Sequence, residues 1–223
     1  MKKYFRKSYV LRYLVIVLVL CVTAMGMTIM RLSQMGTEPF SCLNYAISEH
    51  FHVPMGMTII VINLVLLVFT YLNMKESLGF GTFANMFLIG NFADFWMKIL
   101  KPILSPFATT MISRLFMLCI GMVIMVFACS FYLAGMLGMA PYDSFAYVLE
   151  KMTKGKFPFK WARVFTDSLC VFIAFLIART NRTQWQIIGI GTIIMAFFIG
   201  PLLSFFRERI ADPFMKMLKK LPS

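Results

Sequence analysis

GTEPF at residues 36–40 returns about a hundred residues later as GMAPY at residues 138–142. GFGT at residues 79–82 likewise returns as GIGT at 189–192, and a further glycine follows each, Gly90 in one case and Gly200 in the other. The offset grows from 102 to 110 residues, as small insertions in the loops of a second copy would produce. Tandem duplication inside an apolar chain is a known route to transporter-like membrane proteins. The order of these motifs therefore predicts two copies of one helical unit.

The composition is that of a membrane protein. Hydrophobic residues make up 60% of the chain and charged residues only 14%, whereas a soluble domain carries about a quarter charged residues. The formal net charge is nevertheless +13. In a soluble protein this excess would suggest nucleic acid, but here Lys and Arg stand at the ends of apolar runs, where cytoplasmic loops collect positive charge. We expect the lipid bilayer as a partner and no nucleic acid.

Six apolar runs are long enough to cross a bilayer, which takes about twenty residues. Residues 1–105 form the first repeat, with expected spans near 10–32, 55–73 and 79–99. Residues 106–206 form the second, with expected spans near 111–134, 161–179 and 185–206. Because the first span matches the first span of the second repeat, we expect an uncleaved helix there rather than a signal peptide. The prediction is an all-α, polytopic transmembrane helix bundle built from two three-span repeats.

Each repeat contains an extra short helix of mixed polarity after its first span, expected at 39–51 and at 141–153. Both begin at a proline, Pro39 or Pro141, a residue well suited to the first turn of a helix. They are too short and too polar to cross on their own, which favours re-entrant or interfacial helices. Three spans per repeat would make the repeats inverted, whereas crossing short helices would give eight segments and parallel repeats.

Charge placement favours cytoplasmic termini and leaves both span counts open. With six spans, 16 of the 22 Lys and Arg residues fall on the cytoplasmic side, and eight crossings fit the positive-inside rule as well. We favour six because Glu38, Glu49, His50 and His52 would be costly in lipid. The tail at 207–223 reads as a basic amphipathic cytoplasmic segment that meets anionic headgroups, with a plain solvated tail as the alternative.

Ionisable groups inside apolar runs are the best candidates for a binding site, because each is costly unless paired or hydrated. Asp167 lies inside the fifth run, with Arg163 one helical turn before it, so the two can pair on one face. Asn63 holds the matching place in the second run. Two interpretations are open. These residues form a substrate or ion site, or Arg163 and Asp167 form a structural ion pair that stabilises helix packing.

Further polar and small residues complete the candidate set. Asn85 and Asp94, with Thr82, could line a polar path, although Asp94 could also reach the interface at its helix end. The repeated glycines, prolines and threonines are read as helix-packing or gating positions, because GxGT lacks the lysine of a phosphate-binding loop. These positions are Gly36, Pro39, Gly81, Thr82, Gly138, Pro141, Gly191 and Thr192.

The sequence offers no basis for catalysis or for a metal site. The five cysteines are scattered, and there is no CxxC, no Cys/His pair at metal-ligand spacing, no Ser/His/Asp set and no HExxH. We therefore expect no enzyme activity, no metal and no cofactor.

These motifs resemble the YczE/YitT-type bacterial integral membrane proteins from about Arg12 to Phe206. The resemblance rests on Gly-x-x-Pro-[aromatic] after the first span, on the GxGT that opens the third, and on the repetition of both. It implies a bacterial plasma-membrane protein and no particular substrate. In such families the second copy carries Pro-x-Asp and an Arg-x-x-x-acid span, which here places Asp143 with Arg163 and Asp167; the first copy has Ser41 where an acid would be expected.

Two functions are compatible with these features of the chain. The first is a small transporter or permease for an unknown small molecule or ion, with its site between the repeats. The alternative is a non-transporting membrane scaffold or regulatory factor that modulates a partner protein. A membrane enzyme ranks last, and the sequence is compatible with a homo-oligomer.

Overall fold

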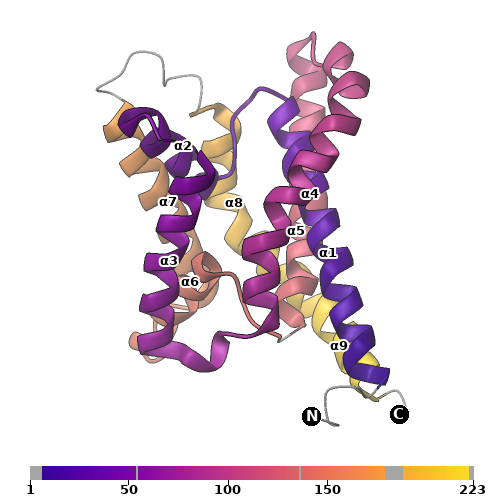
Figure 1. The fold of residues 1–223 in the computed structure, drawn as a ribbon, viewed down its shortest axis with the longest axis vertical. Coiled ribbons are helices and arrows are strands. Elements are labelled where there is room, and N and C mark those ends of the chain that lie inside the picture. The colour runs from indigo at the N-terminus through magenta and orange to yellow at the C-terminus, as the bar shows by residue number, and fades with distance from the viewer. Residues whose placement is uncertain (1–6, 54, 136, 179–187, 221–223) are drawn as a thin grey trace.

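The computed structural model describes residues 7–53, 55–135, 137–178 and 188–220, and every regular element among them is helical (Figure 1). This confirms the all-α expectation. The helices are α1 (Lys7–Leu32), α2 (Pro39–Phe51), α3 (Met55–Met74), α4 (Phe80–Leu104), α5 (Met111–Ala134), α6 (Pro141–Met152), α7 (Phe159–Ala178), α8 (Ile190–Phe206) and α9 (Asp212–Lys220). Short turns follow α3 (η2, Lys75–Ser77) and α4 (η3, Ser105–Phe107), and a π-helical turn joins α8 to α9 (η5, Arg207–Ala211).

Five helical stretches of the described residues are long and apolar enough to cross a membrane. They are Tyr13–Leu32, Met57–Ser77, Met111–Ala134, Phe159–Ala178 and Ile190–Met217. The run expected at 79–99 forms α4, which has 25 residues but is less apolar, because it carries Asn85, Asn91 and Asp94. The run expected at 185–206 begins in part outside the described residues. The chain is thus a multi-pass membrane protein in which α4, although long enough, is not among the five stretches apolar enough to cross.

The centre of the bundle is the crossing of α1 and α5. A Cβ added to Gly26 would lie 2.7 Å from the carbonyl oxygen of Gly121, so only glycine permits this approach of the two backbones. Around this crossing α4 packs on α1, α8 packs on α5 and α7, α2 packs on α7, and α3 packs on α6. Figure 1 shows the start of α1 beside α9, so both lie at the same end of the molecule.

The repeated motifs contact each other crosswise. The loop before α2 lies on the start of α8, where the Gly191 N–H donates to the Met35 carbonyl at 2.9 Å. The loop before α6 lies on the start of α4 in the same way, with the Gly81 N–H donating to the Leu137 carbonyl at 2.7 Å. Both loops turn through a glycine of positive φ, +120° at Gly36 and +114° at Gly138. Each Gly-x-x-Pro loop therefore depends on the GxGT turn of the other half.

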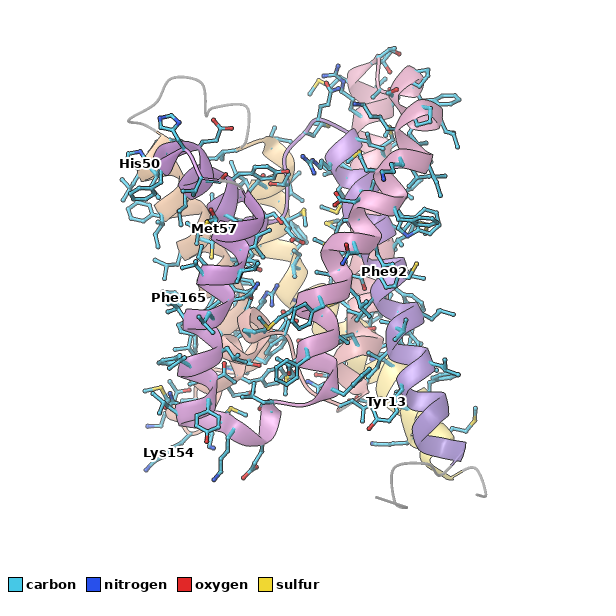
Figure 2. The ribbon with its side chains drawn as sticks, in the orientation of Figure 1. Tyr13, His50, Met57, Phe92, Lys154 and Phe165 are labelled. Carbon is cyan, nitrogen blue, oxygen red and sulfur yellow. The ribbon has the colours of Figure 1, made fainter. Side chains whose placement is uncertain are left out.

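The short helices α2 and α6 meet at their first turns. The Phe40 and Tyr142 rings stack with centroids 4.4 Å apart. From this junction the helices diverge, and Figure 2 places His50, near the end of α2, and Lys154, just after α6, at opposite ends of the molecule. At about 1.5 Å per residue, helices of 13 and 12 residues fall well short of the roughly 30 Å of a hydrocarbon core.

Candidate functional site

A buried arginine joins two aspartates at the centre of the bundle. Arg163 and Asp167 lie one turn apart on α7, and the guanidinium Nε donates to Asp167 Oδ2 at 3.2 Å. Its Nη1 donates to Asp143, which the first turn of α6 brings against α7. The three side chains are between 1% and 11% exposed, so the ion pairs are shielded from solvent. One cation thus holds two carboxylates from two helices.

Tyr142 completes this charged cluster from α6. Its hydroxyl donates to Asp167 Oδ1 at 2.5 Å and lies 3.4 Å from Cys170 Sγ. The Arg163 guanidinium carbon stands 4.5 Å from the centre of the Tyr142 ring, a cation–π distance. The ring therefore contacts both Arg163 and the stacked Phe40, and so links the charged cluster to the junction of α2 and α6.

The cluster faces a cavity of about 150 Å³. Its polar wall includes Asn63 from α3, Asn85 from α4 and Asn44 from α2, and its apolar wall comes mainly from α1, α5 and α8. Asn44 is fully buried; its amide Nδ2 donates to the Phe40 carbonyl at 2.7 Å, while its Oδ1 has no hydrogen-bond partner among the described residues. A residue of the cavity lining therefore carries a buried acceptor that the described side chains leave unpaired.

A second cavity of about 340 Å³ adjoins the first, and we call it the vestibule. Arg31, at the end of α1 remote from α9, and Asp94 on α4 belong to its lining. Glu38 and Ser41 line both cavities, so they stand at the boundary between the vestibule and the inner cavity.

Glu38 is the acidic group at this boundary. The Ser41 hydroxyl donates to its Oε1 at 2.7 Å, and the described residues offer it no ion pair within 4 Å. Burial raises the pKa of the Glu38 carboxyl above its ordinary value, and the Ser41 hydrogen bond and the Arg163 charge offset only part of the rise. The position therefore favours a bound proton or another positive charge.

The helices that match α3 and α4 in the other half of the chain, α7 and α8, are packed differently around the matching glycine. The helices α7 and α8 pack closely, and a Cβ added to Gly200 would lie 2.4 Å from the Lys160 carbonyl. Gly90 holds the matching place on α4, and a Cβ there would meet nothing within 4 Å, because α3 and α4 barely contact each other in the described chain. The vestibule is lined by α1, α4 and the residues that begin α2, with Ile59 as the one lining residue from α3 among those described.

The predicted site residues fall into three groups. Arg163, Asp167 and Asp143 form the ion-paired cluster, Asn63 and Asn85 line the same inner cavity, and Asp94 lies apart from them in the vestibule. Among the packing or gating candidates, Pro39 lines the inner cavity and Pro141 begins α6. The remaining candidates lie at the crossed loop–helix junctions: Gly36, Gly191 and Thr192 at one, and Gly81, Thr82 and Gly138 at the other.

Three contributors were missed by the sequence reasoning. The sequence presents Glu38 only as a charge too costly for lipid, and Asn44 and Tyr142 are not among its candidate site residues. The available signal was their position: Glu38 directly precedes the proline of one repeated motif, and Tyr142 is the aromatic residue of the other. Within the described part of the chain, no group of three or more His, Cys, Asp or Glu side chains is placed to hold a metal ion.

Comparison with known proteins gives a family and several relatives. The family described as "Family of unknown function (DUF6198)" matches residues 10–208. The chain is 28% identical over 171 residues to the "Uncharacterized membrane protein YczE" of Bacillus subtilis (strain 168), covering 77% of this chain and 73% of that protein. It is 25% identical over 197 residues to an uncharacterized protein of Haemophilus influenzae, covering 88% and 84%, and 23% identical over 195 residues to YyaS of Bacillus subtilis, covering 87% and 91%. No solved structure matches.

Proposed function

We propose, from the premise that this chain belongs to the DUF6198 family of YczE-type membrane proteins, that it is a small transporter of the bacterial plasma membrane. The substrate site is the inner cavity beside Arg163, Asp143 and Asp167, and both termini are cytoplasmic. Ion-paired side chains inside a membrane protein that also border a cavity are typical of a solute or ion pathway.

An inverted pair of three-span repeats underlies the proposed transporter. Its support is the sequence duplication together with the crossed junctions, in which matched residues donate and accept matched hydrogen bonds. The stacking of Phe40 on Tyr142 adds to this, because the two residues hold the same place in the two motifs. Discontinuous short helices that meet beside a central site are typical of transporters with inverted repeats.

The observation that carries the proposal is the unequal packing of matched helices. The vestibule lies against α4 at Gly90, and α3 and α4 barely contact each other, while the matching pair α7 and α8 is closely packed at Gly200. In an inverted-repeat carrier the two pairs exchange these arrangements, and the inner cavity then opens to the other side. The described arrangement is the state open toward the end remote from α9, which the proposed topology makes the outside.

Site-directed labelling from each side of the membrane tests this exchange. Ala93→Cys in the vestibule and Leu203→Cys, its match on α8, are made separately after the five native cysteines are replaced by alanine. We expect an impermeant maleimide to label Ala93→Cys only from outside and Leu203→Cys only from the cytoplasm, at a slower rate. Leu203 is 1% exposed and lines the inner cavity, so labelling from the cytoplasm and not from outside is the result that requires α7 and α8 to separate.

The opposite result favours the scaffold function. A Leu203→Cys protein that stays unlabelled from both sides, while Ala93→Cys reacts, has only one conformation and cannot alternate. A binding partner that co-purifies through detergent would then be the expected finding. Transport by Asp167→Asn in liposomes is a second test, because a transporter that uses this cluster should lose flux while remaining folded.

A further inference from the structure

The inner cavity carries an excess of negative charge. Among the described residues that line it, three are acidic (Glu38, Asp143 and Asp167) and one, Arg163, is basic. The first turns of α2 and α6 also face the cavity and contribute roughly +0.5 charge each. The balance is about one unit of negative charge, so a single positive charge would neutralise the site.

Glu38 is where that positive charge belongs. Arg163 is already engaged by two aspartates, whereas Glu38 has a hydrogen bond from Ser41 and no described cation within ion-pair distance. Glu38 is half-buried, and a carboxylate withdrawn from water is stabilised by a paired cation or a bound proton. The site therefore has a defined place for one added cation or one added proton.

A second acceptor stands in the same cavity. The Asn44 side chain is 0% exposed, and its Oδ1 has no hydrogen-bond partner in the described chain. Donation from its Nδ2 to the Phe40 carbonyl fixes the orientation of the amide, so the oxygen is the free end. A buried acceptor of this kind needs a donor, and leaving it unpaired costs about 1–3 kcal/mol.

The rest of the cavity suits a short carbon chain. Phe40 offers an aromatic wall, and Ile59, Ile89, Met125 and Ile199 offer aliphatic ones. Metal ions prefer several oxygen ligands at once, and no three acidic, His or Cys side chains of the described residues are placed to hold one. The lining therefore matches a molecule with a charged, donating end and an apolar body.

We propose that the inner cavity binds a small monovalent organic amine, with its ammonium group between the Glu38 carboxylate and the Asn44 amide oxygen. The amine is the substrate class of the proposed transporter. Its transport depends on that proposed function, whereas its binding to the cavity does not. The ammonium N–H groups donate to both acceptors, and the carbon chain lies against the apolar walls.

Binding of the amine displaces a proton. The free Glu38 carboxyl keeps its proton to a higher pH than an ordinary glutamate because burial raises its pKa, and a neighbouring ammonium favours its ionised form. Affinity should accordingly fall by about tenfold per pH unit below the pKa of the free site. The other ionisable groups around the two cavities are Arg31 on α1, Tyr45 on α2, Asp94 on α4, Cys129 on α5, Tyr142 and Asp143 on α6, and Arg163 and Asp167 on α7.

The test is calorimetry on the full chain purified in detergent. The probes are n-butylammonium, 1-butanol, butyrate and sodium chloride, the first three of which share one carbon chain and differ in charge. We expect binding of butylammonium alone, with affinity reduced at least tenfold in Glu38→Gln and severalfold in Asn44→Leu. Glu49→Gln is the matched control, because Glu49 is an exposed acid on the same helix and lines neither cavity.

Two results would overturn the proposal. One is equal affinity for butylammonium in Glu38→Gln and the unchanged protein; the other is binding of butanol, butyrate or sodium as tight as that of the amine. If Glu38→Gln does not fold, proton release on adding butylammonium to the unchanged protein replaces it, and absence of release counts against the site. If butylammonium binds but does not cross the membrane of liposomes, the amine site stands and the transport function is wrong. If Leu203→Cys is labelled from the cytoplasm but no amine binds, the transporter proposal stands and the amine as its substrate is wrong.

Discussion

At the scale of single residues, Arg163 has the largest consequences. Its guanidinium is the shared partner of Asp143 and Asp167, which come from different helices and are both buried. An arginine can serve two carboxylates because its planar fork presents several N–H donors at fixed angles. Removing it would leave two buried carboxyl groups without their cation.

We predict that Arg163→Met destabilises the protein by about 3–5 kcal/mol, the range for breaking a buried ion pair from one side. Chemical unfolding in detergent, followed by circular dichroism, measures the loss. Lys160→Met is the control, because Lys160 lies one turn earlier on α7, is exposed and takes part in no described ion pair. Equal losses in the two variants would contradict the central role of the cluster.

Only part of the site can be read from the sequence. The i, i+4 spacing predicts that Arg163 and Asp167 can pair, because a helix puts these positions on one face. That Asp143 joins them depends on α6 packing against α7, which no local pattern encodes. Glu38 resembles an interfacial acid in the sequence, and its burial comes from the way the preceding loop lies over the start of α8.

At the scale of elements, the crossed junctions hold the two halves together. A side chain at Gly138 would meet the Gly79 backbone nitrogen at 2.6 Å, and one at Gly36 would meet the Thr192 hydroxyl at 2.5 Å. Both glycines also have φ values that favour glycine strongly. Each position is therefore constrained twice, by conformation and by space.

Gly138→Ala should consequently cost clearly more stability than Gly155→Ala. Gly155 also has a positive φ, +78°, but a Cβ there would meet nothing within 4 Å, so its variant bears only the conformational penalty of about 1 kcal/mol. Melting temperatures in the same detergent compare them. If the two alanine variants have the same melting temperature, the close approach of the loop to the start of α4 does not hold in solution.

The difference between the two helix pairs lies beyond sequence reasoning for a specific reason. Gly90 and Gly200 occupy matching places, so the sequence pattern predicts the same packing around both. The structure instead has open space at Gly90 and close contact at Gly200. How closely two helices pack depends on all the side chains between them and on the elements around them, which one matching glycine does not specify.

At the scale of the whole molecule, the short helices decide the topology. Composition and apolar run length suffice to predict a multi-pass helical protein, but not whether α2 and α6 cross. The structure brings their first turns together and sends their far ends to opposite ends of the bundle (Figure 2). With six crossings, the loops that follow α2 and α6 face opposite sides of the membrane, whereas with eight they face the same side.

Cysteine labelling in intact cells distinguishes the two arrangements. In the cysteine-free background, Glu49→Cys near the end of α2 should react with an impermeant maleimide, and Lys156→Cys after α6 should react only once the membrane is permeabilised. Both positions are exposed, so access rather than burial determines the result. Labelling of both variants under the same condition would support eight crossings.

The stacked rings of Phe40 and Tyr142 have a consequence for the membrane voltage of a cell. They close the meeting point of α2 and α6 with two flat hydrocarbon faces. The faces of the two rings offer an ion nothing that replaces its water shell, whereas the carboxylates that line the cavity beside them do. An ion that leaks through the protein would therefore have to part the two rings, and the electrical conductance of a membrane that contains Phe40→Ala is the measurement that shows whether they act as a barrier.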